Sequence, residues 1–270
     1  MKLTDFEYAG EKLSTKGCMV CSFDGSGDET RALGGNLTFN SVQNNNSFIQ
    51  HKISTTYDGV YSPDAFSICK INCGDPKDSY WSESEIREFM KWLNKESYEK
   101  FRPIYDNVYG GTYFKGYFNV SVHEFGGFVI GLDLTFVTNA PFGFGEEIKI
   151  SDQTVTSGGY LSINTTSDKT GYIYPTMKVK CTSAGDLEIT DSENRKTVVK
   201  NCSANEVVTF SGETKIPTTS LSSHTKFAQE FNYIFPRLKT TNSSDLNKLK
   251  FSLPCVVSVE FAPIRKVGIL

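Results

Sequence analysis

The stretch YFKGYFNVSVHEFGGFVIGLDLTFVT, residues 113–138, sets the first expectation about the fold. Apolar residues alternate with polar ones in Tyr113–Val122 and again in Phe128–Val137, which is the period of a half-buried β-strand. Between the two runs stands a glycine pair, Gly126–Gly127, and glycine accepts the positive φ angles that a tight hairpin turn requires. The stretch therefore predicts an antiparallel hairpin.

The rest of the chain has the same β character. Leu37–Val42 and Met177–Cys181 also alternate at period two. The 270 residues include 20 Phe, 13 Tyr and 2 Trp, and long apolar runs are absent. This composition is typical of short half-buried strands joined by polar turns, so we expect a mainly β protein.

One segment breaks the β pattern. Ser82-Glu-Ser-Glu85 has the form of a capping box, with Ser82 as the N-cap, and Asn94 is a suitable stop. The apolar residues that follow the box fall on one helical stripe: Ile86, Phe89, Met90 and Leu93. We predict one helix at about residues 83–94, with this stripe buried against a sheet.

A break in the chain at residues 139–145 suggests a domain boundary. Pro141-Phe-Gly-Phe-Gly145 stops the preceding strand pattern, and beyond it charges become sparse and turn signals recur. We therefore expect a first β domain at 1–142 and a β-sandwich at 146–262. A C-terminal tail, 263–270, is expected to dock back on the first domain. Phe142 and Phe144 either fill a crease between the domains or fill the edge of a local core.

Length and charge limit the functions that fit. The formal net charge of −3 does not imply nucleic acid or an anionic membrane as a partner. No stretch approaches the roughly 20 apolar residues needed to span a bilayer, so membrane insertion is not expected. The N-terminus has no apolar signal core, so we expect a cytosolic product with reduced thiols.

Seven cysteines raise the question of a metal site. A four-thiolate zinc site would use Cys18, Cys21, Cys69 and Cys73. Against it, Cys18–Cys21 reads as a strand, in which positions three apart point to opposite faces. No turn glycine follows Cys21 to form a metal-binding knuckle, and no helix opens there for a redox motif. We predict core thiols and no metal.

The search for catalytic chemistry finds no constellation. The three histidines, His51, His123 and His224, have no nucleophile motif nearby, and no nucleotide-binding or metalloprotease motif occurs. A loop with three carboxylates could gather a cation, but a solvated loop is the simpler interpretation: Asp24, Asp28 and Glu29. We predict no catalytic, cofactor-binding or metal-ligating residue, no cofactor and no enzymatic activity.

Three groups of segments together resemble the distal tail protein family of long-tailed bacteriophages. The first is the opening Leu3–Leu13. The second is the passage from helix to strand, comprising Glu85–Asn94, Tyr98–Asp106 and Tyr113–Val120. The third resembles the galectin-like domain of that family and comprises Leu187–Val199, Glu206–Phe210, Phe235–Leu238 and Asn247–Phe251. A longer polar insertion at 239–246 departs from the family's common ending.

The resemblance implies a structural role in a virion. It implies a tail-tube-like first domain that forms a homo-hexameric ring, and a galectin-like second domain. The partners would be the tail tube protein, the tail-tip hub protein, the tape measure protein and receptor-binding proteins. DNA would pass the channel without sequence-specific binding. The protein would be made in the host bacterial cytoplasm and located at the distal end of the tail.

Two other functions are alternatives to this structural role. A carbohydrate-binding module for adsorption would need an exposed aromatic ring beside polar groups. Trp81 and Trp92 lie in the helix region, which leaves three tyrosines of the second half as candidates: Tyr160, Tyr172 and Tyr174. A cell-wall hydrolase is disfavoured because histidines are few and catalytic motifs are missing.

Overall fold

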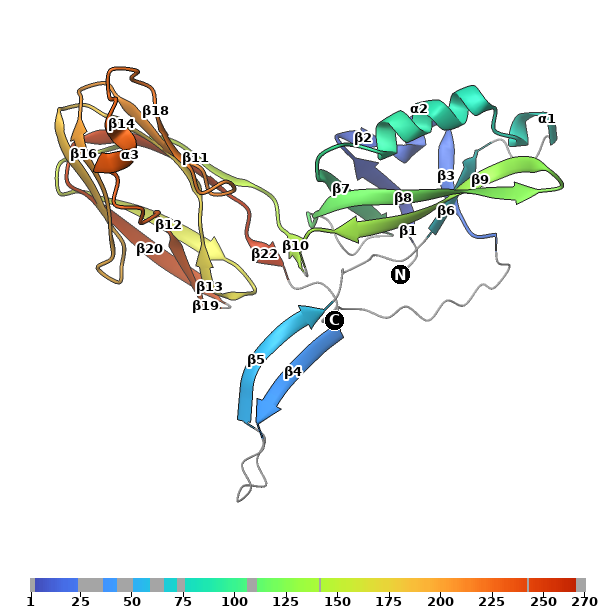
Figure 1. Ribbon diagram of the computed structural model, residues 1–270, viewed down its shortest axis with the longest axis horizontal. Helices are drawn as coiled ribbons and strands as arrows, with labels where there is room; N and C mark the ends of the chain where they lie inside the picture. Colours follow the sequence, from blue (N-terminus) through green and yellow to red (C-terminus); the bar gives the residue numbers. More distant parts are fainter. Residues whose placement is uncertain are drawn as a thin grey trace. The chain divides into compact units, whose positions relative to one another are not determined.

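The computed structural model describes residues 3–23, 36–42, 51–58, 66–71, 76–105, 111–140, 142–241 and 243–265. The acidic loop with Asp24, the fourth cysteine Cys73 and the tail beyond Arg265 lie outside these ranges. The chain is mainly β and divides into two compact units, which we call the first unit, up to Phe144, and the second unit, Gly145–Arg265 (Figure 1). Within the described ranges, no helix has the length and apolar character that crossing a membrane requires.

An antiparallel sheet of seven strands forms the first unit. In sheet order the strands are β2 (Glu11–Lys12), β1 (Leu3–Tyr8), β7 (Glu99–Tyr105), β8 (Phe114–Phe125), β9 (Phe128–Thr138), β6 (Phe66–Lys70) and β3 (Cys18–Cys21). The predicted hairpin is confirmed as β8–β9, because Phe125 pairs with Phe128 across the turn. Gly126 and Gly127 have φ angles of 61° and 84°, as a two-residue turn with two positive φ values requires.

The strand β4 (Asn36–Val42) confirms the strand predicted at 37–42, but it belongs to another sheet. It pairs with β5 (His51–Asp58) in a separate two-stranded antiparallel sheet. We call this pair the β4–β5 ribbon.

The predicted helix is α2, Glu83–Leu93 (Figure 1). Both halves of the capping box are present, because the Ser82 hydroxyl accepts from the Glu85 amide and the Glu85 carboxylate accepts from the Ser82 amide. Phe89 and Leu93 are buried as expected. The predicted stripe is wrong at Ile86 and Met90, which are half-buried, while Trp92, outside the stripe, is 4% exposed.

Trp92 is buried because the sheet offers partners for both parts of its side chain. The indole Nε1 donates a hydrogen bond of 3.0 Å to the carbonyl oxygen of Tyr8. The ring stacks on Phe6 with a centroid distance of 5.6 Å. Further aromatic residues complete the core under the helix: Tyr8, Phe101, Phe118 and Phe136. The helix thus covers an aromatic face of the sheet.

Three short helical turns were not expected from the sequence. They are η1 (Leu13–Lys16), α1 (Pro76–Ser79) and α3 (Phe227–Glu230), each of four residues. At this length there is about one turn and therefore little periodic signal.

The break at 139–145 contains a short strand, β10 (Gly143–Phe144). Phe144 exchanges two backbone hydrogen bonds of 2.8 and 2.7 Å with Tyr113, and their rings stack with centroids 5.6 Å apart. Phe142 packs edge-on against Phe144 at 5.5 Å. These contacts lie within the first unit, where Phe144 is half-buried.

The second unit is a β-sandwich. Its five-stranded sheet has the order β11 (Ile148–Val155), β21 (Cys255–Phe261), β14 (Thr176–Cys181), β17 (Val207–Phe210) and β18 (Pro217–Thr219). Its four-stranded sheet has the order β12 (Tyr160–Thr166), β20 (Ser244–Phe251), β15 (Gly185–Thr190) and β16 (Lys196–Cys202). A third pair is β13 (Thr170–Ile173) with β19 (Leu238–Thr241), and β22 (Ile264–Arg265) follows β21.

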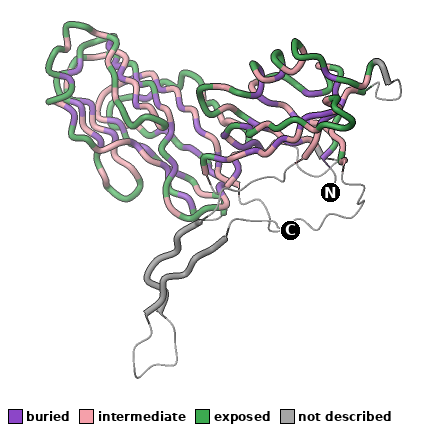
Figure 2. The backbone as a smooth tube through the Cα atoms, turned by 45° about the vertical axis from the view of Figure 1, so that its right-hand side comes forward, coloured by how far each residue is buried: buried purple, intermediate pink, exposed green. Residues whose placement is uncertain are grey.

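Alternation along these strands explains why two layers form. In β12 every second residue is buried, and in β21 buried residues alternate with half-buried ones (Figure 2). The inward set makes one apolar core, and the outward set of the four-stranded sheet remains available for other contacts.

Candidate functional site

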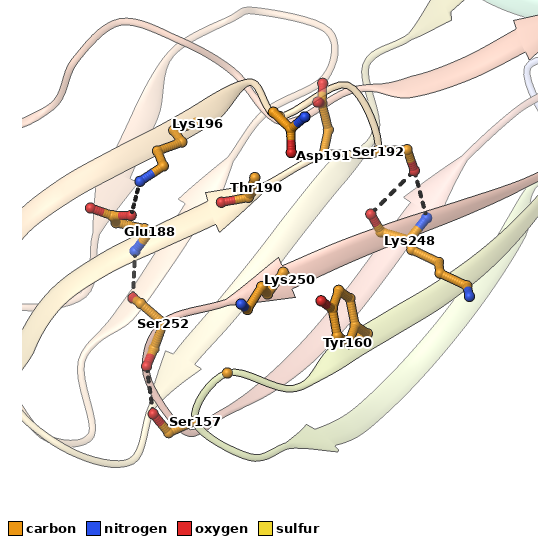
Figure 3. A pocket seen from close by; sticks show the side chains of 12 residues that line it. Ser157, Tyr160, Glu188, Thr190, Asp191, Ser192, Lys196, Lys248, Lys250 and Ser252 are labelled. Atoms are coloured by element: carbon orange, nitrogen blue, oxygen red, sulfur yellow. Dashed lines mark hydrogen bonds and ion pairs between the residues drawn. The ribbon is translucent and has the colours of Figure 1, made fainter.

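A polar groove lies on the outer face of the four-stranded sheet (Figure 3). Its volume is about 710 Å³, within the range of roughly 300–1,000 Å³ that ligand-binding clefts occupy. Twelve residues line it: Ser157, Gly158, Tyr160, Glu188, Thr190, Asp191, Ser192, Asn194, Lys196, Lys248, Lys250 and Ser252. We call it the sheet groove.

One row of residues crosses all four strands and forms the groove floor. Tyr160 of β12 pairs with Lys250 of β20, and Lys250 also pairs with Thr190 of β15. Thr190 in turn pairs with Lys196 of β16. Because residues opposite one another in a sheet point to the same side, this row presents its side chains to solvent together.

Hydrogen-bonded turns hold the two ends of the groove in place. At one end, the Ser157 hydroxyl donates to the Ser252 carbonyl at 2.7 Å, and the Glu188 amide donates to the Ser252 hydroxyl at 2.7 Å. At the other end, one oxygen of Asp191 accepts the amides of Glu193 and Arg195, both at 2.9 Å. These hydrogen bonds therefore fix the backbone that carries the groove side chains.

Ion pairs neutralise the carboxylates of the groove, but two lysines stay uncompensated. Glu188 pairs with Lys196 at 2.9 Å, and Asp191 pairs with Arg237 at 2.9 Å. For Lys248 and Lys250, no carboxylate of the described ranges lies within ion-pair distance. The sheet groove is locally positive on a chain with net charge −3.

The three candidate tyrosines have different surroundings. The Tyr172 ring lies under the Arg237 guanidinium at 3.8 Å, and its hydroxyl donates to Glu193. The Tyr174 ring is covered by the Lys215 ammonium at 3.4 Å. Tyr160 is 60% exposed and lies in the groove, with the Lys250 Nζ 5.9 Å from its ring centroid. Tyr160 is thus the one of the three with a ring free for stacking.

His224, assigned from the sequence to a polar turn, lies in a buried charge cluster. Its side chain is 6% exposed, and its two ring nitrogens lie 2.7 Å from oxygens of Glu206 and Glu230. The Glu206 side chain has no exposed surface and also accepts from the Thr219 hydroxyl at 2.5 Å. Burial by itself would lower the pKa of His224, but the hydrogen bonds that its ring donates to both carboxylates outweigh burial and raise that pKa.

This cluster has a stabilising role and not a catalytic one. A protonated imidazole that donates from both nitrogens keeps no lone pair for a general base. Burial would raise the pKa of Glu206, but its hydrogen bonds to Thr219, Ser203 and His224 lower it. The cluster thus holds paired charges and connects the turns around Glu206 and His224 to helix α3.

His123 makes no catalytic arrangement with the described residues around it. His123 stacks on Phe23 at 4.1 Å and lies 3.2 Å from Asp133, at a partly exposed position. The side chain of His51 lies outside the description.

The cysteine pair Cys18 and Cys21 lies on strand β3, as the sequence indicated. Cys18 is buried, and burial raises the pKa of its thiol to about 11, which keeps it protonated and weakly nucleophilic. Among the residues with described positions, no group of three potential ligands gathers around a metal-sized space.

We predict that purified protein carries far less than one zinc per chain and that a chelator leaves its melting temperature unchanged. The reason is that Cys18 and Cys21 stand three positions apart on strand β3, so their side chains point to opposite faces of the sheet. Elemental analysis with a melting curve in excess chelator tests this. One bound zinc per chain, or a chelator-dependent melting temperature, would restore the site with Cys73.

Aromatic residues also gather at the tip of the β8–β9 hairpin in the first unit. Phe125 is 76% exposed and Phe128 is 54% exposed. Phe128 stacks on Tyr80 with centroids 4.5 Å apart, and the Trp81 amide donates to the Val129 carbonyl at 2.9 Å. Exposed aromatic clusters of this kind mark contact surfaces.

Comparison with known proteins gives two family matches and a similar solved structure. The model of a phage tail protein N-terminal domain matches residues 1–140, and that of a phage tail C-terminal domain matches residues 142–261. The crystal structure of the Dit protein of phage SPP1 is similar, with a TM-score of 0.63 and 12% identity. The likeness covers 97% of this chain and 99% of that one.

The SPP1 protein is described as a paradigm of the hub adsorption apparatus in phages that infect Gram-positive bacteria. At 12% identity the likeness shows the fold alone, a two-domain β architecture. No curated protein matches this chain in sequence.

Proposed function

The chain belongs to a family of phage tail proteins, and on that premise we propose that it forms a hexameric ring at the distal end of the tail. One observation carries the proposal. The two family models together match residues 1–140 and 142–261, and a hub adsorption protein shares the fold over 97% of the chain. The role is structural, in the virion tail, and no enzymatic step is part of it.

The two halves have different tasks in this proposal. Residues 1–142 form the ring, and residues 146–262 form the galectin-like domain outside it, with the tail 263–270 docked on the ring domain. The ring joins the tail tube to the hub protein and receptor-binding proteins, with the tape measure protein and DNA in its channel. The protein is made in the host bacterial cytoplasm before assembly. A net charge of −3 suits passage of DNA without binding.

A closed ring of identical subunits needs two unlike surfaces, and the first unit offers two candidates for them. The β4–β5 ribbon pairs with no third strand in the described ranges, and isolated two-stranded sheets are marginal in water. A neighbouring subunit that adds a strand or a side-chain layer would complete it. The aromatic tip of β8–β9 supplies the second surface.

We predict closed six-fold rings, or stacked pairs of rings, when the protein is concentrated. Each contact should bury on the order of 1,000 Å² or more, since smaller contacts are typical of crystal packing. Negative-stain images and light-scattering mass test this. A closed dimer without a channel would overturn the proposal.

Replacing residues 36–58 by a Gly-Ser linker should abolish the rings, because it removes one of the two surfaces. The melting temperature should stay within a few degrees, because the seven-stranded sheet does not include the ribbon. Phe125→Ser with Phe128→Ser is the matched change on the other surface and should also weaken ring formation. Rings that survive both changes would exclude these surfaces as contacts.

A second candidate function, saccharide binding during adsorption, is favoured by the sheet groove. The observation is an exposed tyrosine beside polar and charged side chains in a braced cleft. Ring formation by the first unit and sugar binding by the second are compatible.

A further inference from the structure

We propose that the sheet groove binds an acidic saccharide, with a sugar ring on Tyr160 and the acidic group held by Lys248 and Lys250. This inference rests on the second candidate function and is independent of the ring. It names the chemical class of the ligand, which the saccharide hypothesis alone leaves open.

The positive charge of the sheet groove suits an anionic ligand. Its carboxylates Glu188 and Asp191 already have cationic partners at 2.9 Å, so they are not available to repel an anion. Lys248 and Lys250 have none within the described ranges. An anionic group that enters the groove meets two ammonium groups, and charge-assisted hydrogen bonds are stronger than neutral ones.

The spacing of Lys248 and Lys250 allows both ammonium groups to contact one ligand. They stand two residues apart on strand β20, so their Cα atoms are about 7 Å apart and their side chains share a face. Two flexible ammonium groups at this spacing can converge on one phosphate, sulfate or carboxylate. They can also contact successive charges of a repeating polymer.

Tyr160 lies where it can contact the sugar ring that bears the acidic group. Tyr160 is the cross-strand partner of Lys250, so an anion on the lysine places the attached ring next to the tyrosine. The 60% exposed phenol offers an apolar face and a hydroxyl, a combination suited to the faces and hydroxyls of a sugar. Thr190, the other partner of Lys250, adds a hydroxyl on the opposite side.

The shape of the site favours a saccharide over single-stranded nucleic acid. Nucleic-acid grooves combine a basic track with several aromatic rings for successive bases. Among the twelve residues of the groove, Tyr160 is the single aromatic one. A braced polar groove with one aromatic ring fits a hydroxyl-rich chain.

Isothermal titration of the full chain tests the proposal with four probes. They are a galacturonic acid tetramer, a neutral galactose tetramer of equal length, inorganic polyphosphate and an oligothymidine. The acidic tetramer should bind at least about tenfold more tightly than the neutral one, because one lost charge-assisted contact corresponds to about that factor. Its affinity should fall as NaCl rises from 50 to 500 mM.

Variants assign the binding to the groove. Lys248→Ala with Lys250→Ala should weaken the acidic tetramer by about 30-fold or more, and Tyr160→Ala by about tenfold. The matched control is Lys178→Ala with Lys180→Ala, an equally spaced exposed pair on β14 in the opposite sheet. The control should leave the affinity unchanged. All five substituted positions are exposed, so melting temperatures should not move.

Each other result contradicts the proposal in a distinct way. Equal binding of both tetramers would keep saccharide binding and overturn the acidic class. Tighter binding of polyphosphate or oligothymidine, unaffected by Tyr160→Ala, would replace the sugar by a plain anion or nucleic acid. An equal loss of affinity in the control variant Lys178→Ala with Lys180→Ala would place binding outside the groove. Absence of binding by all probes would overturn both this inference and the second candidate function, and would leave the ring proposal untouched.

Discussion

His224→Ala is expected to lower the free energy of unfolding of the second unit by about 3–5 kcal/mol. The substitution leaves Glu206, whose side chain has no exposed surface, without its cationic partner in the protein interior. Removing one member of a buried ion pair is costly because the remaining charge stays desolvated. Denaturant unfolding followed by circular dichroism measures the change.

His123→Ala provides the matched control, since His123 also lies beside a carboxylate. Its distance to Asp133 is 3.2 Å, and both side chains are about a third exposed. Solvent screens such pairs, so the expected loss is at most about 1 kcal/mol. Equal losses for the two histidines would show that the buried cluster is not a stabilising brace.

The same cluster predicts the pH dependence of the second unit. The pKa of His224 is raised in the folded state, so its stabilisation is complete below the usual value of 6.5. That stabilisation is lost as pH rises through the folded pKa. The pKa of Glu206 is lowered, so its contribution is present above the usual 4.5 and is lost as pH falls through the folded pKa.

The stability difference between the wild-type chain and His224→Ala should therefore shrink as pH rises from 6 to 9. Melting temperatures measured across that range give this difference. A difference that stays constant with pH would contradict a protonated, doubly paired His224.

Leu93→Asp is expected to destabilise the first unit by at least about 4 kcal/mol. Leu93 has no exposed surface and packs in the aromatic cluster between helix α2 and the sheet. The substitution removes apolar contacts and places a carboxylate among buried apolar side chains. Thermal unfolding should show the loss, and rings should disappear with the folded first unit.

Two positions on the same helix serve as controls for that change. Lys91 is exposed and pairs with Glu88, so Lys91→Asp should cost less than about 1 kcal/mol. Ile86 is half-buried, so Ile86→Asp should cost an intermediate amount, about 1–3 kcal/mol. A melting temperature for Leu93→Asp no lower than that for Lys91→Asp would refute the burial of the stripe.

Local features of the chain were predicted from sequence because their causes lie within a few residues. The capping box at Ser82 and Glu85 places the start of α2, since both of its hydrogen bonds span three residues. The turn of β8–β9 follows from two glycines with positive φ between alternating runs. The galectin-like sandwich was expected from the resemblance of the second half.

Contacts between distant residues were decided by the tertiary structure alone. Trp92 is buried because Tyr8, 84 positions away, offers its carbonyl oxygen, and no helical pattern contains that partner. His224 looked like a residue of a solvated turn because Glu206 and Glu230 meet it only after three segments have packed. The sheet groove arises in the same way. Tyr160 and Lys250 are 90 positions apart, and each alone is an ordinary exposed strand residue. Strand alternation predicts which side chains face outward, whereas the pairing of strands across the sheet decides which outward side chains become neighbours.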